Sequence, residues 1–320
     1  MQLAISRSGF TLARMAGSEK QSISALTRYC AVLGHPIAHS ASPAMQNAGI
    51  TMLGLDWCYV AYDVDPQELR KALDGAKAMR FIGLNLTVPH KLLAVDMMDV
   101  LDRSAKTWGA VNTVLFEARS KGRGWKSMRE VKAGEVTAVR TRGFNTDADA
   151  IVRAISEDLR IRLSGAKVLL LGVGGAGRVA ALKLAEAGAS LHLVNRTEEK
   201  ATALAVEIKR RRRGSQVNVG YPDRPVDLVV NATSLGLRRT DELPLNPKRF
   251  PLSKAGAVFD MIYQPPETPL LRLAKAAGCR TANGLSMLLH QGAAALEIWS
   301  GKRAPVAQMR EALEAHVYAR

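Results

Sequence analysis

The sequence predicts an α/β protein built from two domains. Short apolar runs of strand length alternate with helical patterns along most of the chain, and this βαβ rhythm favours mostly parallel sheets covered by helices. A glycine-rich turn separates a strand from a helix near residue 174, which is typical of a Rossmann-type nucleotide-binding domain. With 320 residues, the chain is long enough for two ordinary domains with separate cores.

The first half is expected to contain three strands and two helices before a β-hairpin. The strands are predicted at 29–34, 57–62 and 81–86, and the helices at 42–53 and 65–76. Residues 111–116 form one arm of the hairpin, and the return arm ends at 143–145. The segment 118–142 is basic and longer than a usual hairpin loop, so a mobile surface insertion is predicted there.

The second half repeats the alternation of strands and helices. Strands are predicted at 167–171, 190–194, 227–230 and 257–261, and helices at 287–300 and 305–319.

The composition excludes several classes of protein. No apolar run approaches the roughly 20 residues needed to cross a bilayer, so no membrane role is expected. The net charge of +16 is concentrated in 119–142 and in the run 209–213 at a predicted helix end, where cations are favourable. Such runs are usually solvated, so a nucleic-acid partner is not expected.

Three cysteines, Cys30, Cys58 and Cys279, have neither an even count nor the spacing of a metal site. They indicate a cytoplasmic protein, and no metal is predicted. Residues 1–28 have no secretory apolar region and are expected to be a disordered extension.

The glycine-rich turn has the residues of a phosphate cradle. Gly172, Gly174 and Gly177 have the G-x-G-x-x-G spacing, with Gly175 and Ala176 between them. Glycines let the backbone turn tightly and approach a pyrophosphate, which binds at the positive end of the following helix. Because the turn lies between a strand and a helix, the motif is in the context that supports a dinucleotide site.

The end of the next strand predicts which dinucleotide binds. An NAD site would place a carboxylate about 20 residues beyond the glycines, whereas this chain has Asn195, Arg196 and Thr197, followed by Lys200. A guanidinium can bind a 2′-phosphate that a carboxylate would repel. NADP is therefore favoured over NAD, unless Arg196 is only a solvated turn residue.

Small polar residues follow several predicted strands, where open α/β sheets bind their ligands. Ser40 and Ser42 follow the first strand, and Ser42 before Pro43 is also a candidate helix N-cap. Asn112 and Asp147 flank the hairpin. Each has a structural alternative, since Asn112 could only turn the chain and Asp147 could only begin a helix.

The stretch NLTVPHK, residues 85–91, raises the question of a catalytic lysine. Pro89 ends the strand, and Asn85 and Thr87 share one face of it. A lone lysine in such a place is usually solvated. Hydride transfer to a carbonyl needs a proton source, however, and Lys91 near Asp147 would supply an ammonium group.

Taken together, the motifs resemble those of shikimate dehydrogenase. The matching segments, in the same order as in the family, are 32–43, 85–91, 109–113, 145–147, 172–177, 195–197, 231–234, 260–263 and 283–287 with Gln291. The resemblance spans nearly all of 29–301. It implies reversible, NADPH-dependent reduction of 3-dehydroshikimate to shikimate in aromatic amino-acid biosynthesis.

The resemblance also implies a role for each matching position. Lys91 and Asp147 would be the catalytic pair, and Ser40 and Ser42 would hold the substrate carboxylate. The other implied substrate residues are Asn85, Thr87, Asn112, Tyr263 and Gln291, and the implied cofactor residues are Gly172, Gly174, Gly175, Ala176, Gly177, Asn195, Arg196, Thr197, Lys200, Thr233, Ser234, Gly284 and Met287.

The implied architecture is a substrate domain of 29–147 plus 285–320 and an NADP-binding domain of 148–284, with a cleft between them. Family members are monomers or homodimers. Three features depart from the family: Ala148 and Ala150 where Gly is common, the basic insertion, and the N-terminal extension. None of them removes a residue that the chemistry needs.

Three alternatives remain at this stage. A quinate/shikimate dehydrogenase using NAD shares most of these motifs. Glutamyl-tRNA reductase has a similar glycine-rich turn, but Cys30 and Cys58 lie in predicted strands, where thiols are inert rather than nucleophilic. A non-enzymatic nucleotide- or nucleic-acid-binding module would not need Lys91 and Asp147.

Overall fold

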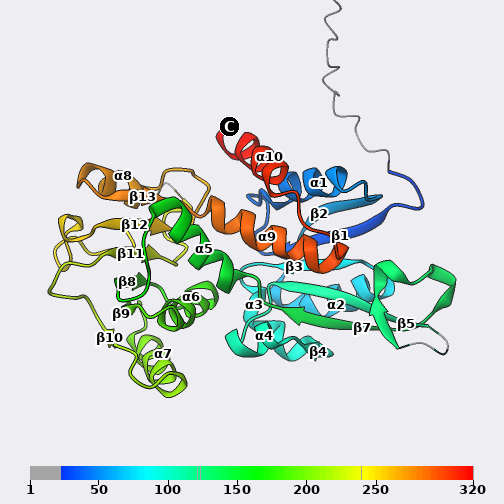
Figure 1. The fold of residues 1–320 in the computed structure, drawn as a ribbon, viewed down its shortest axis with the longest axis horizontal. Helices are drawn as coiled ribbons and strands as arrows, with labels where there is room; N and C mark the ends of the chain where they lie inside the picture. Colours follow the sequence, from blue (N-terminus) through cyan, green and yellow to red (C-terminus); the bar gives the residue numbers. More distant parts are fainter. Residues whose placement is uncertain (1–22, 121, 123, 239, 320) are drawn as a thin grey trace, which may run out of the picture.

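The computed structural model describes residues 23–120, 122, 124–238 and 240–319, and they form two sheets with flanking helices (Figure 1). The predicted extension 1–28 therefore lies mostly outside the described residues. Its last residue, Arg28, begins the first strand.

The first sheet has the order β2-β1-β3-β5-β7-β4, and β6 pairs with β5. The strands are β1 (Arg28–Gly34), β2 (Trp57–Asp63), β3 (Gly83–Leu86), β4 (Val100–Leu101), β5 (Thr113–Ser120), β6 (Trp125–Ser127) and β7 (Val136–Phe144). The pairs β1–β2, β1–β3 and β4–β7 are parallel, whereas the pairs that involve β5 are antiparallel. The sheet is thus parallel in its βαβ part and antiparallel where the hairpin joins it.

Helices from both ends of the chain pack on this sheet. The helices of the first half are α1 (Ser42–Met52), α2 (Leu69–Ala78), α3 (His90–Leu93) and α4 (Arg103–Trp108). The two C-terminal helices, α9 (Leu285–Ser300) and α10 (Val306–Tyr318), return to the same apolar core, where Trp299 and Met309 are fully buried. The first half is therefore completed by residues that follow the second sheet.

The prediction of a loop over 118–142 was wrong, because most of the described residues of this segment lie in strands or short helical turns. β5 and β7 continue the hairpin from Thr113↔Phe144 to Ser120↔Val136, and β6 adds a short third strand. Glu117 pairs with Arg140 at 2.6 Å and with Arg142 at 3.0 Å, so two of the basic residues are tied to a buried carboxylate. The sequence pattern missed this because the pairing joins residues 23 and 25 positions apart.

The predicted N-cap at Ser42 was also wrong. Helix α1 begins at Ser42 itself, its N-cap position is Ala41, and no side chain caps it. Proline still occupies the first turn, where its missing N–H costs nothing. Ser42 is buried, so its hydroxyl is directed into the protein rather than used as a cap.

The second sheet has the order β10-β9-β8-β11-β12-β13, and all its pairs are parallel. Its strands are β8 (Lys167–Leu171), β9 (Ser190–Val194), β10 (Val217–Val219), β11 (Leu228–Asn231), β12 (Ala257–Asp260) and β13 (Arg280–Ala282), and its helices are α5 (Asp147–Leu159), α6 (Gly175–Glu186), α7 (Glu198–Arg211) and α8 (Pro269–Ala276). In chain order the strands read 3-2-1-4-5-6, which is the Rossmann arrangement. Ligands of such sheets bind beyond the carboxyl end of the first strand, here β8.

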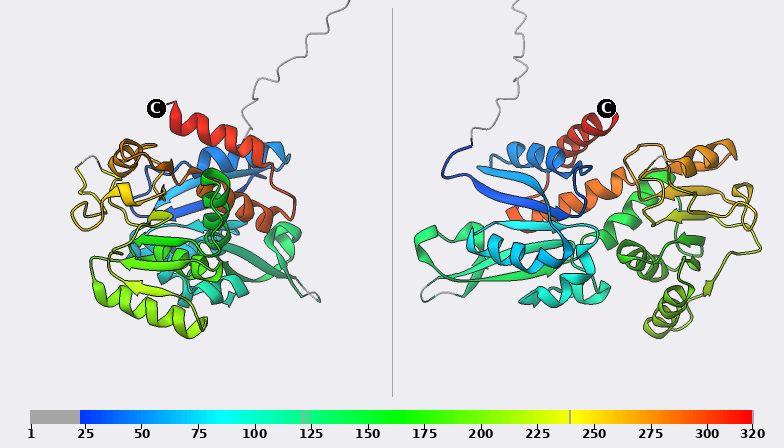
Figure 2. Two further views of the ribbon diagram at one scale, coloured as in Figure 1. Left: turned by 60° about the vertical axis from the view of Figure 1, so that its left-hand side comes forward. Right: turned by 180° about the vertical axis from the view of Figure 1, so that it is seen from behind.

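Helices α5 and α9 connect the two halves, which lie side by side (Figure 2). The β5–β7 hairpin is at the end of the molecule that is farthest from the second sheet, and it is visible from the front and from behind. The hairpin therefore lies away from the junction where the site residues gather.

Cys30 lies in β1 and Cys58 in β2, and both are free thiols, as is Cys279. Burial raises the pKa of the Cys30 thiol far above its usual range, so this thiol is inert near neutral pH. Among the described residues, no helix is long and apolar enough to cross a membrane, and no cluster of His, Cys, Asp and Glu could hold a metal ion.

Candidate active site

Lys91 and Asp147, which are 56 positions apart in the sequence, are in direct contact. Lys91 Nζ donates to Asp147 Oδ2 at 2.7 Å, from the short helix α3 that follows β3. The lysine side chain is 16% exposed and the aspartate 3% exposed. An ion pair this well shielded has a defined geometry, unlike a solvated surface pair.

The start of α5 places the Asp147 carboxylate. Asp147 is the first residue of this helix, where the positive end of the helix dipole favours an anion. The side chain of Asn145 anchors the turn, because its Oδ1 accepts from Ala148 N at 3.2 Å and its Nδ2 donates to Ala110 O at 3.1 Å.

Asn112 fixes the other oxygen of the carboxylate. Its Nδ2 donates to Asp147 Oδ1 at 2.8 Å and to Thr146 Oγ1 at 2.9 Å, while its Oδ1 accepts from Thr146 N at 2.8 Å. Both oxygens of Asp147 are therefore engaged, one by Asn112 and one by Lys91. Gln291 of α9 reaches the same group, with its Oε1 3.4 Å from Asn112 Nδ2.

Asn85 joins this network from the neighbouring strand. Its Nδ2 lies 3.1 Å from Thr113 Oγ1 and 3.2 Å from Asn112 O, and its Oδ1 accepts from the hydroxyl of Tyr59 at 2.8 Å. Burial raises the pKa of Tyr59, so this phenol stays a hydrogen-bond donor.

Sequence reasoning missed three members of this network: Tyr59, Thr113 and Thr146. Thr113 and Thr146 lie within the matching segments 109–113 and 145–147, but the resemblance implied no role for them. Tyr59 had no signal beyond its place in a predicted strand, because its partner Asn85 lies 26 residues away.

Ser40 and Ser42 lie at a second corner of the site, together with Tyr263. The Tyr263 hydroxyl, which follows β12 of the second sheet, accepts from Ala41 N at 3.3 Å, and Ser40 Oγ accepts from Ser42 N at 3.3 Å. Burial raises the pKa of Tyr263, which therefore remains neutral. Thr87 is partly exposed and packs near Gly34, where an added Cβ would lie 2.5 Å from its methyl group.

The glycines of the glycine-rich turn differ in the space around them, and the open position is one where a phosphate could bind. A Cβ on Gly177 would lie 2.1 Å from Gly172 O, and Gly172 itself has φ +89°. A Cβ on Gly174 would have no described heavy atom within 4 Å. Gly177 is therefore needed for close packing and Gly172 for its backbone conformation. Gly174 has no side chain to block a ligand at the start of α6.

The end of β9 lies beside this turn. Asn195 Oδ1 accepts from Val173 N at 3.1 Å, which ties the β9 end to the glycine-rich turn. Arg196, Thr197 and Lys200 are exposed, so their side chains are accessible to a 2′-phosphate. The glycine-rich turn can thus hold the pyrophosphate of NADP, and the residues after β9 can hold its 2′-phosphate.

Thr233 and Ser234 follow β11 on the same side of the sheet. Thr233 is fixed by Asn231, whose Oδ1 accepts from both its backbone N and its hydroxyl, and Ser234 is exposed. At the start of α9, a Cβ on Gly284 would meet Met261 O at 2.0 Å, so only glycine fits there. Met287 is buried one turn further along α9.

The cradle and the proton-transfer pair are neighbours. The Cβ position of Gly175, in the cradle, lies 3.7 Å from Leu92 Cγ, and Leu92 is the residue after Lys91. This contact brings the first turn of α6 against α3. A dinucleotide in the cradle would therefore lie beside α3, the helix that carries Lys91.

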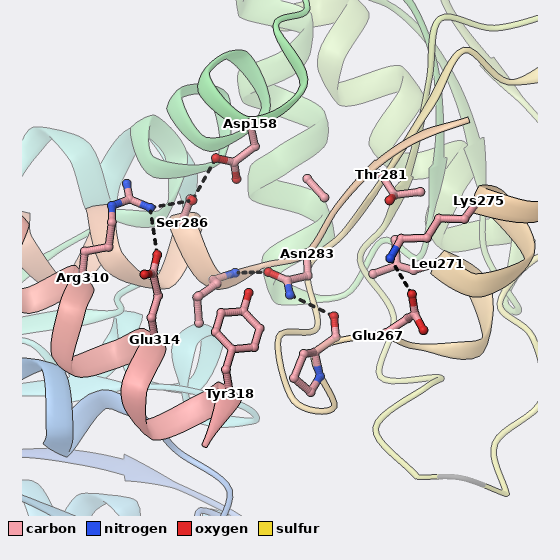
Figure 3. Close-up of a pocket in the computed structure, with 13 residues that line it drawn as sticks. Asp158, Glu267, Leu271, Lys275, Thr281, Asn283, Ser286, Arg310, Glu314 and Tyr318 are labelled. Carbon is pink, nitrogen blue, oxygen red and sulfur yellow. Dashed lines mark hydrogen bonds and ion pairs between the residues drawn. The ribbon is translucent and has the colours of Figure 1, made fainter. Parts of the chain in front are cut away.

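A separate cavity of about 440 Å³ lies between α8, α10 and the start of α9 (Figure 3). It is lined by charged side chains from several elements, including Asp158, Lys275 and Arg310, and by none of the residues that the sequence assigned to substrate, catalysis or cofactor. Two of the lining residues are bonded to each other, since Ser286 Oγ donates to Asp158 Oδ1 at 3.0 Å. We therefore assign the site by its side-chain network and not by this cavity.

Models of known families match three parts of the chain. Residues 32–114 match the shikimate dehydrogenase substrate binding domain, 153–234 match shikimate / quinate 5-dehydrogenase, and 284–314 match the shikimate 5′-dehydrogenase C-terminal domain.

Individual relatives match over most of their length. A shikimate dehydrogenase (NADP(+)) of Methanopyrus kandleri is 38% identical over 304 residues, which cover 92% of this chain and 98% of the relative. A crystal structure of a shikimate dehydrogenase in complex with NADP+ superposes with a TM-score of 0.78 at 33% identity, covering 94% of this chain and 99% of the other. The Thermus thermophilus enzyme, in complex with NADP(H) and shikimate, has a TM-score of 0.72 at 38% identity and covers 90% and 98%.

Proposed function

The chain belongs to the shikimate dehydrogenase family, and we propose that it catalyses the reversible, NADP-dependent reduction of 3-dehydroshikimate to shikimate. The observation that carries this proposal is the shielded Lys91–Asp147 pair, held by Asn112 beside the glycine-rich turn. A module that only bound nucleotides would have no use for a proton donor at that place.

Lys91 has the role of proton donor in this proposal. NADPH, when bound, supplies the hydride for the substrate carbonyl. The Lys91 ammonium group provides the proton for the oxygen that becomes a hydroxyl, and Asp147 holds the ammonium in position. In the opposite direction the neutral amine of the same lysine accepts the proton from the substrate hydroxyl.

The remaining polar residues orient the substrate. We assign its carboxylate to Ser40 and Ser42, as the family resemblance implies; the loop between them donates from Ala41 N to the Tyr263 hydroxyl. Asn85, Thr87, Asn112, Tyr263 and Gln291 are assigned to the hydroxyl-bearing face of the ring. Uncharged hydrogen-bonding groups of this kind suit a polyhydroxylated substrate, since each can donate or accept.

The cofactor site is assigned to residues at the carboxyl ends of the strands in the second sheet. The turn of Gly172, Gly174, Gly175, Ala176 and Gly177 would hold the pyrophosphate. Asn195, Arg196, Thr197 and Lys200 would hold the adenosine 2′-phosphate, and Thr233, Ser234, Gly284 and Met287 would approach the nicotinamide half.

We further propose that the chain divides into a substrate domain of 29–147 plus 285–320 and a cofactor domain of 148–284. Support comes from the apolar core that α9 and α10 share with the first sheet. We also propose that the protein works in the cytoplasm, where free thiols such as those of the described cysteines are stable. It would act there as a monomer or homodimer, as members of the family do.

An assay of the purified protein with two substrates and two cofactors tests this proposal. Shikimate and quinate are each supplied with NADP+ and with NAD+, and reduction of the cofactor is followed at several pH values. Turnover should be fastest with shikimate and NADP+. No turnover with that pair would refute the proposal, and faster turnover with quinate and NAD+ would make the protein a quinate dehydrogenase.

A further inference from the structure

Two arginines from the second half of the chain hold the end of α4. Arg178 of α6 donates to the carbonyl oxygen of Trp108, and Arg211 of α7 donates to that of Thr107. These carbonyls belong to the last turn of α4, where helix C=O groups lack intrahelical partners and cations are favourable.

Glu207 of α7 orients both guanidinium groups. Its Oε1 lies 2.7 Å from Arg178 Nη2 and 2.7 Å from Arg211 Nη2. Glu207 is 20% exposed and the Arg178 side chain 24% exposed, so this arrangement is partly shielded from water. A guanidinium shared between a carboxylate and a carbonyl has its plane fixed, which a lysine could not reproduce.

Two further features of α4 match this contact. Its C-cap residue Gly109 has φ +62°, and a Cβ there would lie 2.9 Å from Arg178 Nη1. The ring of Trp108 is buried in the apolar core of the second half, with Lys183 Nζ of α6 5.3 Å from the ring centroid. The end of α4 is thus docked onto α6 by packing as well as by hydrogen bonds.

The segment that follows Gly109 reaches the catalytic pair directly. Val111 N donates to Lys91 O at 2.8 Å, and the Asn112 side chain donates to Asp147 at 2.8 Å. Ala110 O accepts from Asn145, which anchors the start of α5. Any movement of the end of α4 would therefore change the positions of both Lys91 and Asp147.

We infer that Arg178 is a positioning residue, which couples the cofactor helix α6 to the proton-transfer pair through the segment 109–112. Arg178 lies in the first turns of the helix that begins in the phosphate cradle. Arg178 contacts neither Lys91 nor Asp147. It holds the carbonyl group of Trp108, and the chain continues from there through 109–111 to Asn112. This inference rests on the proposed function.

Kinetics of Arg178→Ala test the inference, with Arg210→Ala as a matched control. Arg210 is an exposed arginine of α7. Misplacing a catalytic group by about 1 Å can cost roughly 100-fold in rate. We expect Arg178→Ala to lower kcat by at least about 10-fold with NADP+ affinity within about 3-fold of normal, and Arg178→Lys to recover little. An unchanged kcat would overturn the inference.

A double-mutant cycle with Asn112→Ala separates positioning from a general loss of stability. If Arg178 acts through Asn112, Arg178→Ala should have little further effect on kcat in the Asn112→Ala background. Equal losses of kcat in both backgrounds would overturn the proposed route.

Hydrogen exchange gives a readout that does not depend on turnover. The amides of Val111 and Asn112 are bonded to Lys91 O and Phe144 O, and both should exchange faster in Arg178→Ala than in Arg210→Ala. Unchanged exchange would overturn the inference. Faster exchange in a protein without shikimate turnover would support the coupling and refute only the proposed function.

Discussion

Gly177 packs so closely on Gly172 that a Cβ at residue 177 would lie 2.1 Å from the Gly172 carbonyl oxygen. Gly174, three residues earlier in the same turn, has open space at the same position. Because these two glycines have different surroundings, the same substitution should have different effects on them.

Gly177→Ala should therefore lower the thermal unfolding temperature, because the helix must move away from the turn. Gly174→Ala should leave that temperature nearly unchanged but weaken NADP+ binding by at least about 10-fold, since the new methyl group occupies the face left for phosphate. Thermal unfolding and titration with NADP+ measure the two effects. Equal loss of stability in both variants would contradict the assignment of the open face.

Lys91→Ala should lower kcat by about 10² to 10⁴, the usual contribution of a positioned proton donor. The Michaelis constant for shikimate should change much less. Lys71→Ala is the control, since Lys71 is an exposed residue paired with Glu68. A near-normal kcat with weakened substrate binding would make Lys91 a binding residue.

Arg196→Ala should weaken NADP+ binding by about 10- to 100-fold, which corresponds to the loss of one charge-assisted contact. NAD+ binding should change little because NAD+ has no 2′-phosphate. Arg224→Ala, another exposed arginine of the same half, serves as the control for net charge. Equal losses for the two cofactors would show that Arg196 does not read the 2′-phosphate.

His290 of α9 should make the protein less stable in mild acid. Burial lowers the pKa of His290 below its usual value, although Glu157 Oε2 lies 2.8 Å from its Nε2 and acts in the opposite direction. We take burial to dominate, because the ring is only 3% exposed. The unfolded chain then binds the proton more readily than the folded protein.

The free energy of unfolding should therefore fall as the pH drops from about 6.5 towards the lower pKa of the folded state. The pKa of Glu157 is also lowered, mainly by Arg153, and it adds a further loss of stability below pH 4.5. Urea unfolding at pH 7, 6 and 5 measures the first effect. His290→Gln should reduce the slope and leave the share of His90, another buried histidine whose pKa burial lowers. A slope that is the same in both proteins would contradict this origin.

Glu117→Gln tests the folded hairpin at the far end of the molecule. It removes the charge that pairs with Arg140 and Arg142, and we expect a loss of about 1 to 3 kcal/mol in the free energy of unfolding. The kcat with shikimate should remain normal, because the hairpin lies away from the site. A variant as stable as the parent protein would show that the ion pairs contribute nothing.

The sequence by itself determined the features that depend on neighbouring residues. The glycine spacing, the strand before it and the helix after it belong to one short segment, so local rules predict them together. The residues directly after β9, Asn195 and Arg196 in place of a carboxylate, are equally local, and they indicate NADP without knowledge of the fold. The predicted ends of five strands, β1, β2, β3, β8 and β9, lie within two residues of the observed ends.

Only the tertiary structure decided which distant groups meet. Lys91 and Asp147 come from α3 and α5, and Tyr59 reaches Asn85 across the first sheet. Glu117 pairs with two arginines between strands β5 and β7, in a segment that was predicted to be a loop. These contacts depend on strand order and register, which are fixed by packing over the whole core. The spacing of neighbouring residues in the sequence therefore does not predict these contacts.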